Sequence, residues 1–160
     1  AHLAPVIPVC EEAGCDIAIT SSSVTLTAPP YLRSIKTIRT MPYPGFPTDA
    51  GPLVIAMLSL ADGTCVFVEN IFENRFRYVD ELNRLGTKIK TEGKIAIIEG
   101  VNSLSGATCK CTDLRGGAAL VVAALACKGQ TAISDISHIL RGYDDIVGTL
   151  ESLNANIKII

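Results

Sequence analysis

Apolar residues along this chain switch repeatedly between a period of two, typical of strands, and a period near 3.6, typical of helices. Glycine and proline separate the two kinds of segment. The pattern predicts helices over 3–13, 50–61, 78–85, 114–128 and 144–153, and strands over 16–20, 24–27, 34–39, 64–70, 88–91, 95–99, 108–111, 132–136 and 156–160. This alternation predicts a mixed α/β fold.

Three similar stretches show that the chain is built from repeated units. EEAGCDIAI (11–19), NRLGTKIKT (83–91) and ESLNANIKI (151–159) each combine a helix end, a turn residue and an alternating strand. The turn residues Gly14, Gly86 and Asn154 tolerate the left-handed conformation that ends many helices. PTD (47–49) and CTD (111–113) each precede an apolar helix. The repeated unit is therefore predicted to be βαβαββ.

The repeat also divides the chain. Residues 30–101 are predicted to form a complete second unit, and 102–160 a third unit that lacks its last strand. Residues 1–29 supply only the closing half of a first unit. We therefore expect the chain to be part of a larger protein; the alternative is a small protein with an irregular first lobe.

Composition narrows the function. The chain has 160 residues, 48% of them hydrophobic, and a formal net charge of −2. No basic tract is present, so we expect neither nucleic acid nor a membrane surface as a partner. The longest apolar run, 116–127, is too short to span a bilayer and is predicted to be a buried helix. The six cysteines are interpreted as reduced thiols of a cytoplasmic protein, and their spacing predicts no metal site.

The stretch TMPYPGFPTD, residues 40–49, is unusually stiff. Three prolines fix backbone angles and remove amide donors, so the stretch can be neither helix nor central strand. It ends in Asp49. Thr48/Asp49 and Thr112/Asp113 have the residue types of helix N-caps, and this reading and a functional one stay equally open for Asp113. A cap does not need three prolines, so for Asp49 the pattern favours a carboxylate held for chemistry.

Three arginines accompany these aspartates. Arg75 and Arg141 precede the second helix of their units, and Arg115 follows Asp113 closely. Repeated units place equivalent turns on one rim. The residues could form surface ion pairs, or a cradle for a phosphate or carboxylate ligand. Residue pattern alone leaves both open.

Four motifs together resemble one family. PYPGFPTD, ENIFENRF, ATCKCTDLRGGAAL and RGYDDI are similar to the motifs of the UDP-N-acetylglucosamine enolpyruvyl transferases, or 1-carboxyvinyltransferases, which start bacterial peptidoglycan synthesis in the cytoplasm. The resemblance runs from Leu3 to Ile160. 5-Enolpyruvylshikimate-3-phosphate synthase shares the fold but not PYPGFPTD, so it is ranked well below.

The resemblance implies a fold and a reaction. The expected fold is an incomplete inside-out α/β barrel lobe of βαβαββ units, with helices inside and sheets outside. The expected reaction moves an enolpyruvyl group from phosphoenolpyruvate to the 3'-hydroxyl of UDP-N-acetylglucosamine, without a cofactor or metal. It implies that Asp49 takes the hydroxyl proton and that Arg115 and Arg141 stabilise phosphoenolpyruvate. It further implies that Ile71 with Phe72 contacts the nucleotide sugar, and that Arg75 and Asp113 support the rim.

Two features depart from the family pattern. The helix after Thr48-Asp49 starts Ala50-Gly51-Pro52-Leu53 where glutamine is usual, and Leu140 stands where aspartate is frequent. The family's cysteine-bearing loop and its Lys-Asn and Arg ligands lie outside this chain, in the missing lobe. We therefore expect the chain alone to be inactive and to self-associate through uncovered edges. The alternatives are a non-catalytic nucleotide-sugar binding module and half of a split enzyme completed in trans.

Overall fold

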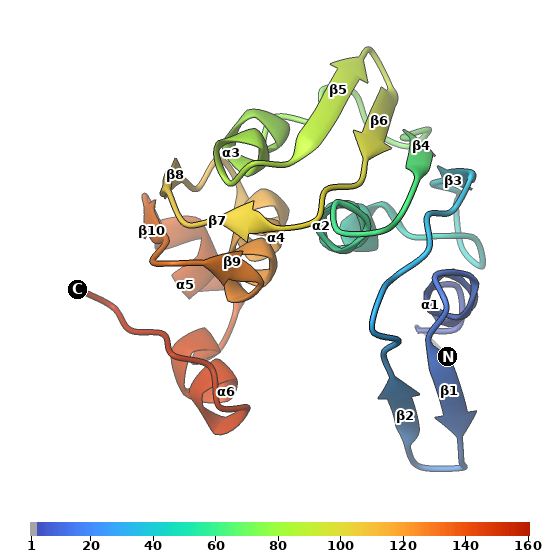
Figure 1. Cartoon of the computed structure of the whole chain (residues 1–160), viewed down its shortest axis with the longest axis horizontal. Coiled ribbons are helices and arrows are strands. Elements are labelled where there is room, and N and C mark those ends of the chain that lie inside the picture. Colours follow the sequence, from blue (N-terminus) through green and yellow to red (C-terminus); the bar gives the residue numbers. More distant parts are fainter. Residues whose placement is uncertain (1–2) are drawn as a thin grey trace.

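The computed structural model describes residues 3–160, and helices and strands alternate along it largely as predicted (Figure 1). In chain order the elements are α1 (Ile7–Glu12), β1 (Asp16–Ile19), β2 (Val24–Thr27), β3 (Thr37–Arg39), η1 (Thr48–Ala50), α2 (Gly51–Leu58), β4 (Thr64–Val68), α3 (Val79–Arg84), β5 (Lys88–Glu92), β6 (Ile95–Glu99), β7 (Leu104–Ser105), β8 (Thr108–Lys110), α4 (Leu114–Leu125), β9 (Cys127–Lys128), β10 (Ala132–Ser134), α5 (Ser137–Gly142) and α6 (Ile146–Ser152).

The predicted second unit folds as one four-stranded sheet with two helices. The strand order is β3-β4-β6-β5; β3 and β4 are parallel, and β6 is antiparallel to both β4 and β5. With α2 after β3 and α3 after β4, the order is the predicted βαβαββ. The unit boundaries at 29/30 and 101/102 stay predictions.

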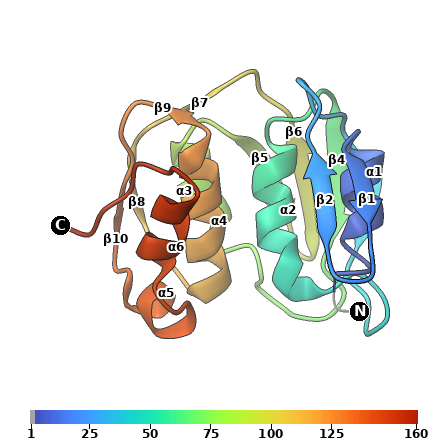
Figure 2. The same ribbon diagram turned by 90° about the horizontal axis from the view of Figure 1, so that it is seen from below.

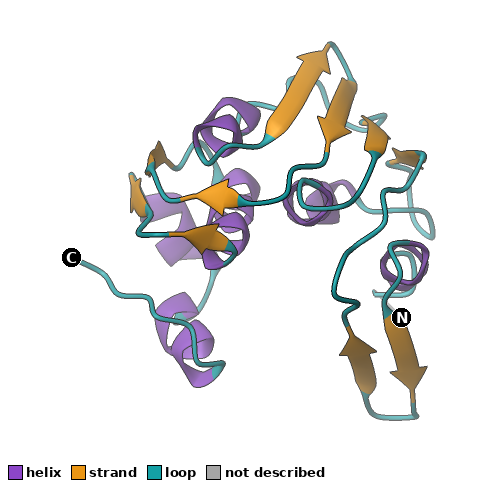
Figure 3. Ribbon diagram, in the orientation of Figure 1, coloured by secondary structure: helices purple, strands orange, loops and turns teal. Residues whose placement is uncertain are grey.

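Two apolar helices form the interior. α2 and α4 lie side by side, with strands along the outside of the molecule (Figures 1, 2 and 3). Ile55 and Leu58 of α2 and Ala119 and Leu120 of α4 belong to one buried cluster, which also contains Phe67 of β4. An element that is apolar on most sides has to be covered on most sides. The expected arrangement of helices inside and sheets outside is therefore found, although the four sheets formed by residues 3–160 do not close into a barrel.

Two glycines let α4 pack this closely. A Cβ atom on Gly116 would lie 2.6 Å from Cβ of Tyr78, and one on Gly117 would lie 2.6 Å from Sγ of Cys111. Both distances are shorter than a carbon or sulfur contact allows. The Gly-Gly pair of the LRGGAAL motif thus serves packing of α4 against the segments before α3 and after β8.

Gly116→Ala is expected to lower the free energy of unfolding by up to about 2 kcal/mol, because overpacking costs about 1–3 kcal/mol and the roughly 1 kcal/mol that alanine gains in a helix offsets only part of that cost. Urea unfolding measures it. Val122→Ala, at an exposed position of the same helix, is the control and should change stability by less than about 0.5 kcal/mol. An unchanged or raised stability of Gly116→Ala would contradict the packing described.

The three repeated turns are confirmed. Gly14, Gly86 and Asn154 follow α1, α3 and α6, and their φ angles are 99°, 94° and 65°. All three lie in the left-handed region, in which asparagine is the most tolerated residue after glycine.

The third unit differs from the prediction at several points, including the strands β7 and β9, which were not predicted. The helix from Leu114 ends at Leu125, because Cys127 pairs with Leu104 to form the parallel strands β9 and β7. The short helix α5 was not predicted, and α6 begins at Ile146, after 144. The predicted strand 156–160 is wrong: the segment is extended, but within residues 3–160 it has no strand beside it, whereas β5 pairs with β6 at the same point of the second unit.

The cysteines are free thiols. Cys15, Cys65, Cys109 and Cys111 are buried, and Cys10 and Cys127 are half-buried. Within residues 3–160 no helix is long and apolar enough to cross a bilayer. The same residues contain no cluster of three or more potential metal ligands.

The hairpin of β1 and β2 projects from the rest of the molecule (Figure 1). In its register Ile17 lies opposite Leu26, and Ile19 opposite Val24. Residues directly opposite each other share a face, so these four side chains form one apolar face, of which Ile19, Val24 and Leu26 are exposed.

We expect the isolated chain to self-associate through this face, because exposed apolar strands invite pairing. Light scattering over a range of concentrations measures the molar mass. Leu26→Glu should lower the mass towards that of a monomer, whereas Thr25→Glu, on the opposite face of the same strand, should leave it unchanged. A monomeric wild-type chain at high concentration would show the expectation to be wrong.

Candidate functional site

The proline-rich loop is held in place by a buried aromatic side chain as well as by its prolines. Phe46 is buried and meets Phe67 of β4 edge to face, with ring centroids 6.1 Å apart. Met41 N donates to Phe46 O at 2.9 Å, and Gly45 N donates to Pro42 O at 2.8 Å. The loop is therefore folded back onto the sheet, and the residues that follow it start from a fixed place.

Asp49 lies in the single 3₁₀ turn η1, directly before α2. Its side chain accepts no capping hydrogen bond, and the residue before α2 is Ala50. The helix-cap interpretation of Asp49 is thus wrong, since its carboxylate points away from the helix amides. Pro52 occupies the first turn of α2, where the missing amide donor costs nothing.

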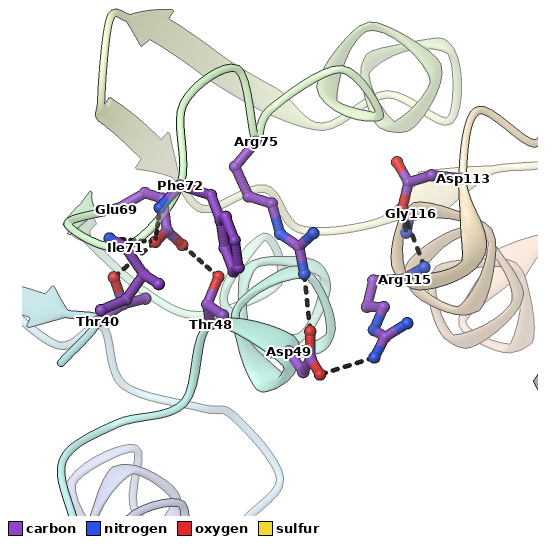
Figure 4. Close-up of polar contacts among 10 residues, drawn as sticks. All are labelled: Thr40, Thr48, Asp49, Glu69, Ile71, Phe72, Arg75, Asp113, Arg115 and Gly116. Atoms are coloured by element: carbon purple, nitrogen blue, oxygen red, sulfur yellow. Dashed lines mark hydrogen bonds and ion pairs between the residues drawn. The ribbon is translucent and has the colours of Figure 1, made fainter. Parts of the chain in front are cut away.

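The Asp49 carboxylate lies between two guanidinium groups (Figure 4). Arg75 Nη2 donates to Oδ1 at 2.8 Å and Arg115 Nη2 donates to Oδ2 at 2.7 Å. The three residues come from η1, from the segment before α3 and from the first turn of α4. The Asp49 side chain is still 56% exposed, so each oxygen keeps a lone pair that a ligand can reach.

These contacts set the charge of Asp49. The hydrogen bond from Arg115 lowers the pKa of the carboxyl group; partial burial opposes it, and the charges of Arg115 and Arg75 lower the pKa further. The same pairing raises the pKa of Arg115. Asp49 is therefore ionised at neutral pH and able to accept a proton, but it is a weak base while both arginines contact it.

Asp113 is the N-cap of α4. Its Oδ1 accepts hydrogen bonds from the backbone of Arg115 at 3.0 Å and of Gly116 at 2.9 Å. An N-cap satisfies amides that the helix leaves unpaired. Its observed contact is thus to the helix backbone, and it orients the turn that carries Arg115.

Arg75 is held by two aromatic rings. Phe76, the next residue, packs edge to face on Phe67 with centroids 6.3 Å apart. The Arg75 guanidinium lies over the Phe72 ring, 5.4 Å from its centroid, within the range of a cation–π contact. Phe67 therefore anchors both the loop before Asp49, through Phe46, and the segment that carries Arg75.

Glu69 is a site residue that the sequence reading missed. It follows β4, is 1% exposed, and accepts four hydrogen bonds. Thr40 Oγ1, Ile71 N and Phe72 N donate to Oε1 at 2.9, 2.8 and 3.1 Å, and Thr48 Oγ1 donates to Oε2 at 2.7 Å (Figure 4). The available signal was an acid directly after a run of apolar strand residues, TCVFV.

The pKa of Glu69 reflects this setting. Burial alone raises the pKa, but the four hydrogen bonds outweigh burial and hold it below the ordinary value of a glutamate. A carboxylate that accepts several hydrogen bonds is stabilised in its charged form. Because no cation forms an ion pair with it among residues 3–160, Glu69 is a buried charge balanced only by neutral donors.

The structure brings most of the predicted site residues together, but not all. Ile71 and Phe72 form the turn next to Glu69, and both side chains are exposed. Arg141 precedes the helix α6 as predicted, but it lies in the last turn of the unpredicted helix α5, exposed and, within residues 3–160, without an ion pair.

The chain belongs to the EPSP synthase (3-phosphoshikimate 1-carboxyvinyltransferase) family, a class of enolpyruvyl transferases, whose family model matches residues 2–150. Curated relatives of the chain are named UDP-N-acetylglucosamine 1-carboxyvinyltransferase. UDP-N-acetylglucosamine 1-carboxyvinyltransferase of Desulfofundulus thermocisternus is 49% identical over 156 residues, or 98% of this chain and 64% of the relative. The enzyme numbered 2 of Caldanaerobacter subterraneus subsp. tengcongensis is 42% identical over 156 residues, or 98% of this chain and 37% of the relative. The resemblance inferred from the motifs is confirmed.

Solved structures agree on the fold. The enolpyruvyl transferase NikO from Streptomyces tendae superposes with a TM-score of 0.88 at 29% identity, covering 98% of this chain and 36% of NikO. EPSP synthase of Acinetobacter baumannii superposes with a TM-score of 0.58 at 16% identity, which supports the fold alone. The chain spans about a third of NikO and of the Caldanaerobacter relative, and less than two thirds of the Desulfofundulus relative.

The lowered pKa of Asp49 predicts a response to pH and to mutation. Arg115→Gln removes the largest cause of the shift, so the Asp49 pKa should rise towards the ordinary value of about 3.9. Carbon-13 NMR of the carboxyl group measures it. Lys88→Gln, which breaks an exposed ion pair with Glu99 instead, is the control and should leave the Asp49 pKa unchanged.

The stability effect follows in sign. Because the folded-state pKa lies below the unfolded one, the ion pairs stabilise the protein above about pH 3.9, and this contribution disappears as the pH falls further. For such an exposed carboxylate it is small, about 0–1 kcal/mol. An Asp49 pKa that Arg115→Gln does not raise would rule out the pairing shown in Figure 4.

Proposed function

We propose that this chain forms one side of the active site of an enolpyruvyl transferase that uses phosphoenolpyruvate and UDP-N-acetylglucosamine. The observation that supports it most directly is the Asp49 carboxylate between Arg75 and Arg115, at 2.8 and 2.7 Å. The same site contains an ionised acceptor for a proton and guanidinium donors for an anion. The acceptor sugar is inferred from the relatives that are 42% and 49% identical.

In this proposal Asp49 is the general base. It accepts the proton of the 3'-hydroxyl as the sugar oxygen bonds to the central carbon of phosphoenolpyruvate, while the methylene carbon takes up a proton from a general acid of the other lobe. The tetrahedral adduct then loses a proton from the new methyl group as the bond from the central carbon to the phosphate oxygen breaks, which restores the double bond and releases phosphate. A base must lie within hydrogen-bond reach of the proton it takes. The anchored loop before Asp49 suits that requirement, because it leaves the carboxylate little freedom.

Arg115 has two partners in this scheme. Phosphoenolpyruvate brings a carboxylate and a phosphate, which guanidinium groups bind strongly. When Arg115 turns towards such an anion, its hydrogen bond to Asp49 weakens. Since that hydrogen bond is the largest cause of the lowered Asp49 pKa, binding of the anion makes Asp49 a stronger base. Arg141 is proposed as the second arginine for phosphoenolpyruvate, and it is exposed and free of ion pairs among residues 3–160.

The remaining residues are assigned to the acceptor and to support. Ile71 and Phe72 are proposed to contact the nucleotide sugar, which fits a turn with two exposed apolar side chains beside the base. Arg75 and Asp113 are proposed as supports, one for the Asp49 carboxylate and one for the first turn of α4. The family's remaining substrate ligands are proposed to come from the other lobe of the enzyme.

We predict that the chain alone releases no phosphate from the two substrates, and that adding the part of the Caldanaerobacter transferase outside the match restores release. Asp49→Asn should abolish the restored activity, because an amide cannot take up the proton. Asp62→Asn, at an exposed aspartate, is the control and should retain it. Phosphate release by the unmixed chain that depends on Asp49 would contradict the prediction.

Binding is tested separately by NMR titration of the chain with UDP-N-acetylglucosamine. The proposal predicts that the amide signals of Ile71 and Phe72 shift first, because they lie in the proposed contact. Shifts confined to other parts of the chain would contradict the assignment. Tight binding that does not respond to Asp49→Asn would favour the non-catalytic binding module instead.

A further inference from the structure

Glu69 lies where the two ends of the proline-rich loop meet the turn of Ile71 and Phe72. Its Oε2 contacts Thr48, the neighbour of Asp49, and its Oε1 contacts the backbone of Ile71 and Phe72 (Figure 4). We propose that Glu69 is a positioning residue, which fixes the place of the Asp49 base relative to the turn that contacts the nucleotide sugar. This inference rests on the proposed function, since it concerns residues of that site.

The contacts form a closed ring. Glu69 holds the Phe72 amide, the Phe72 ring lies under the Arg75 guanidinium, and Arg75 donates to Asp49. Asp49 follows Thr48, whose hydroxyl returns to Glu69. In such a ring no member moves without breaking a contact, so the distance between base and turn is set by the whole ring. Glu69 is the member that is fully buried.

Glu69 also fastens both ends of the proline-rich loop. Thr40 donates to it at the start of the loop and Thr48 at the end. The Thr40 hydroxyl in turn accepts from Asn70 N at 2.7 Å, and Asn70 Nδ2 donates to Thr40 O at 3.2 Å. Prolines stiffen the chain between these ends but do not fix the positions of the ends. The hydrogen bonds to the buried Glu69 carboxylate fix those positions.

A carboxylate suits this role better than a neutral side chain. It is an acceptor only, with two oxygens and about four lone pairs, and here it receives four donors. A glutamine at this place would offer only one acceptor oxygen, and its NH2 group, itself a donor, would face another hydrogen-bond donor. Each buried donor left without a partner costs about 1–3 kcal/mol. The cost of burying a charge is thus offset by donors from three segments, which only this arrangement brings together.

The test uses two conservative variants of the arm towards Asp49. Thr48→Val keeps the shape of the side chain but removes the hydroxyl, and Thr48→Ser keeps the hydroxyl. We expect Thr48→Val to raise the Asp49 pKa, measured by carbon-13 NMR, since the carboxylate no longer sits between its two arginines, and Thr48→Ser to return the pKa to the wild-type value. The amide protons of Ile71 and Phe72 should be unaffected by either change.

The other arm is tested with Glu69→Gln. The loss of charge weakens the acceptor, so the amide protons of Ile71 and Phe72 should move upfield, and the Asp49 pKa should change as well. Because a substitution at a buried charge can prevent folding, the Thr48 pair stands by itself as a test.

A matched control separates positioning from stability. Thr87 is a buried threonine whose hydroxyl donates to Asn83 Oδ1 at 2.8 Å, between α3 and β5. Thr87→Val should lower the free energy of unfolding about as much as Thr48→Val, by about 1 kcal/mol, and leave the Asp49 pKa unchanged. Equal Asp49 pKa values in wild type, Thr48→Val and Thr48→Ser would overturn the proposal and reduce Glu69 to a purely structural role.

Activity gives the last comparison. In the mixture that restores phosphate release, Thr48→Val should lower kcat about 10- to 100-fold, the scale of a displacement near 1 Å, with KM for UDP-N-acetylglucosamine nearly unchanged. An unchanged kcat would also overturn the proposal. The two hypotheses fail differently: without the proposed function, the wild-type mixture is inactive, whereas the NMR response to Thr48→Val still shows whether Glu69 positions Asp49.

Discussion

Two buried helices, α2 and α4, begin side by side, and the site is built where they begin. Asp49 lies in η1, the turn directly before α2, and Arg115 lies in the first turn of α4, so the packing of the two helices brings the carboxylate and the guanidinium to 2.7 Å. Gly116 and Gly117 let α4 pack closely on its other side, against Tyr78, Cys111 and Ile139, and so help to fix the position of α4. Apolar burial in the interior thus determines a polar contact at the rim.

A second layer of control comes from β4. Phe67 in this strand packs against Phe46 and Phe76, and Glu69 just after it binds Thr48 and the Phe72 amide. One strand therefore anchors the loop before the base and the segment that holds Arg75. The buried aromatic pairs hold the two segments against β4, and hydrogen bonds to the buried Glu69 carboxylate orient them. Neither these rings nor this carboxylate is exposed to substrate.

The exposed part of the site carries more positive than negative charge. Asp49 faces Arg75 and Arg115, and the hydrogen bond from Arg115 together with both positive charges lowers the pKa of the Asp49 carboxyl group. An anion that binds here shares the two arginines with Asp49, and these contacts make its binding favourable. In the proposed enolpyruvyl transfer, this links binding of one substrate to the strength of the base that acts on the other.

Local sequence was enough to predict the elements that depend on neighbours along the chain. The βαβαββ order, the left-handed turns at Gly14, Gly86 and Asn154, and the burial of 116–121 within the apolar run follow from side-chain period and backbone sterics, which act over a few residues. The motifs identified the family, and they pointed to Asp49, Arg75 and Arg115 as candidates. The motifs could not show whether the side chains of these three residues contact one another.

Tertiary packing decided the rest. The end of α4 at Leu125 and the extended but unpaired segment 156–160 depend on which strand lies alongside, and short-range preference does not report that. Asp49 and Asp113 belong to similar Thr-Asp pairs, yet Asp49 contacts two arginines and Asp113 caps a helix, because their surroundings differ. Glu69 was missed for the same reason. A lone glutamate after an apolar strand is expected at the surface, whereas the structure buries it and brings to it donors from both ends of the proline-rich loop and from the turn at Ile71 and Phe72.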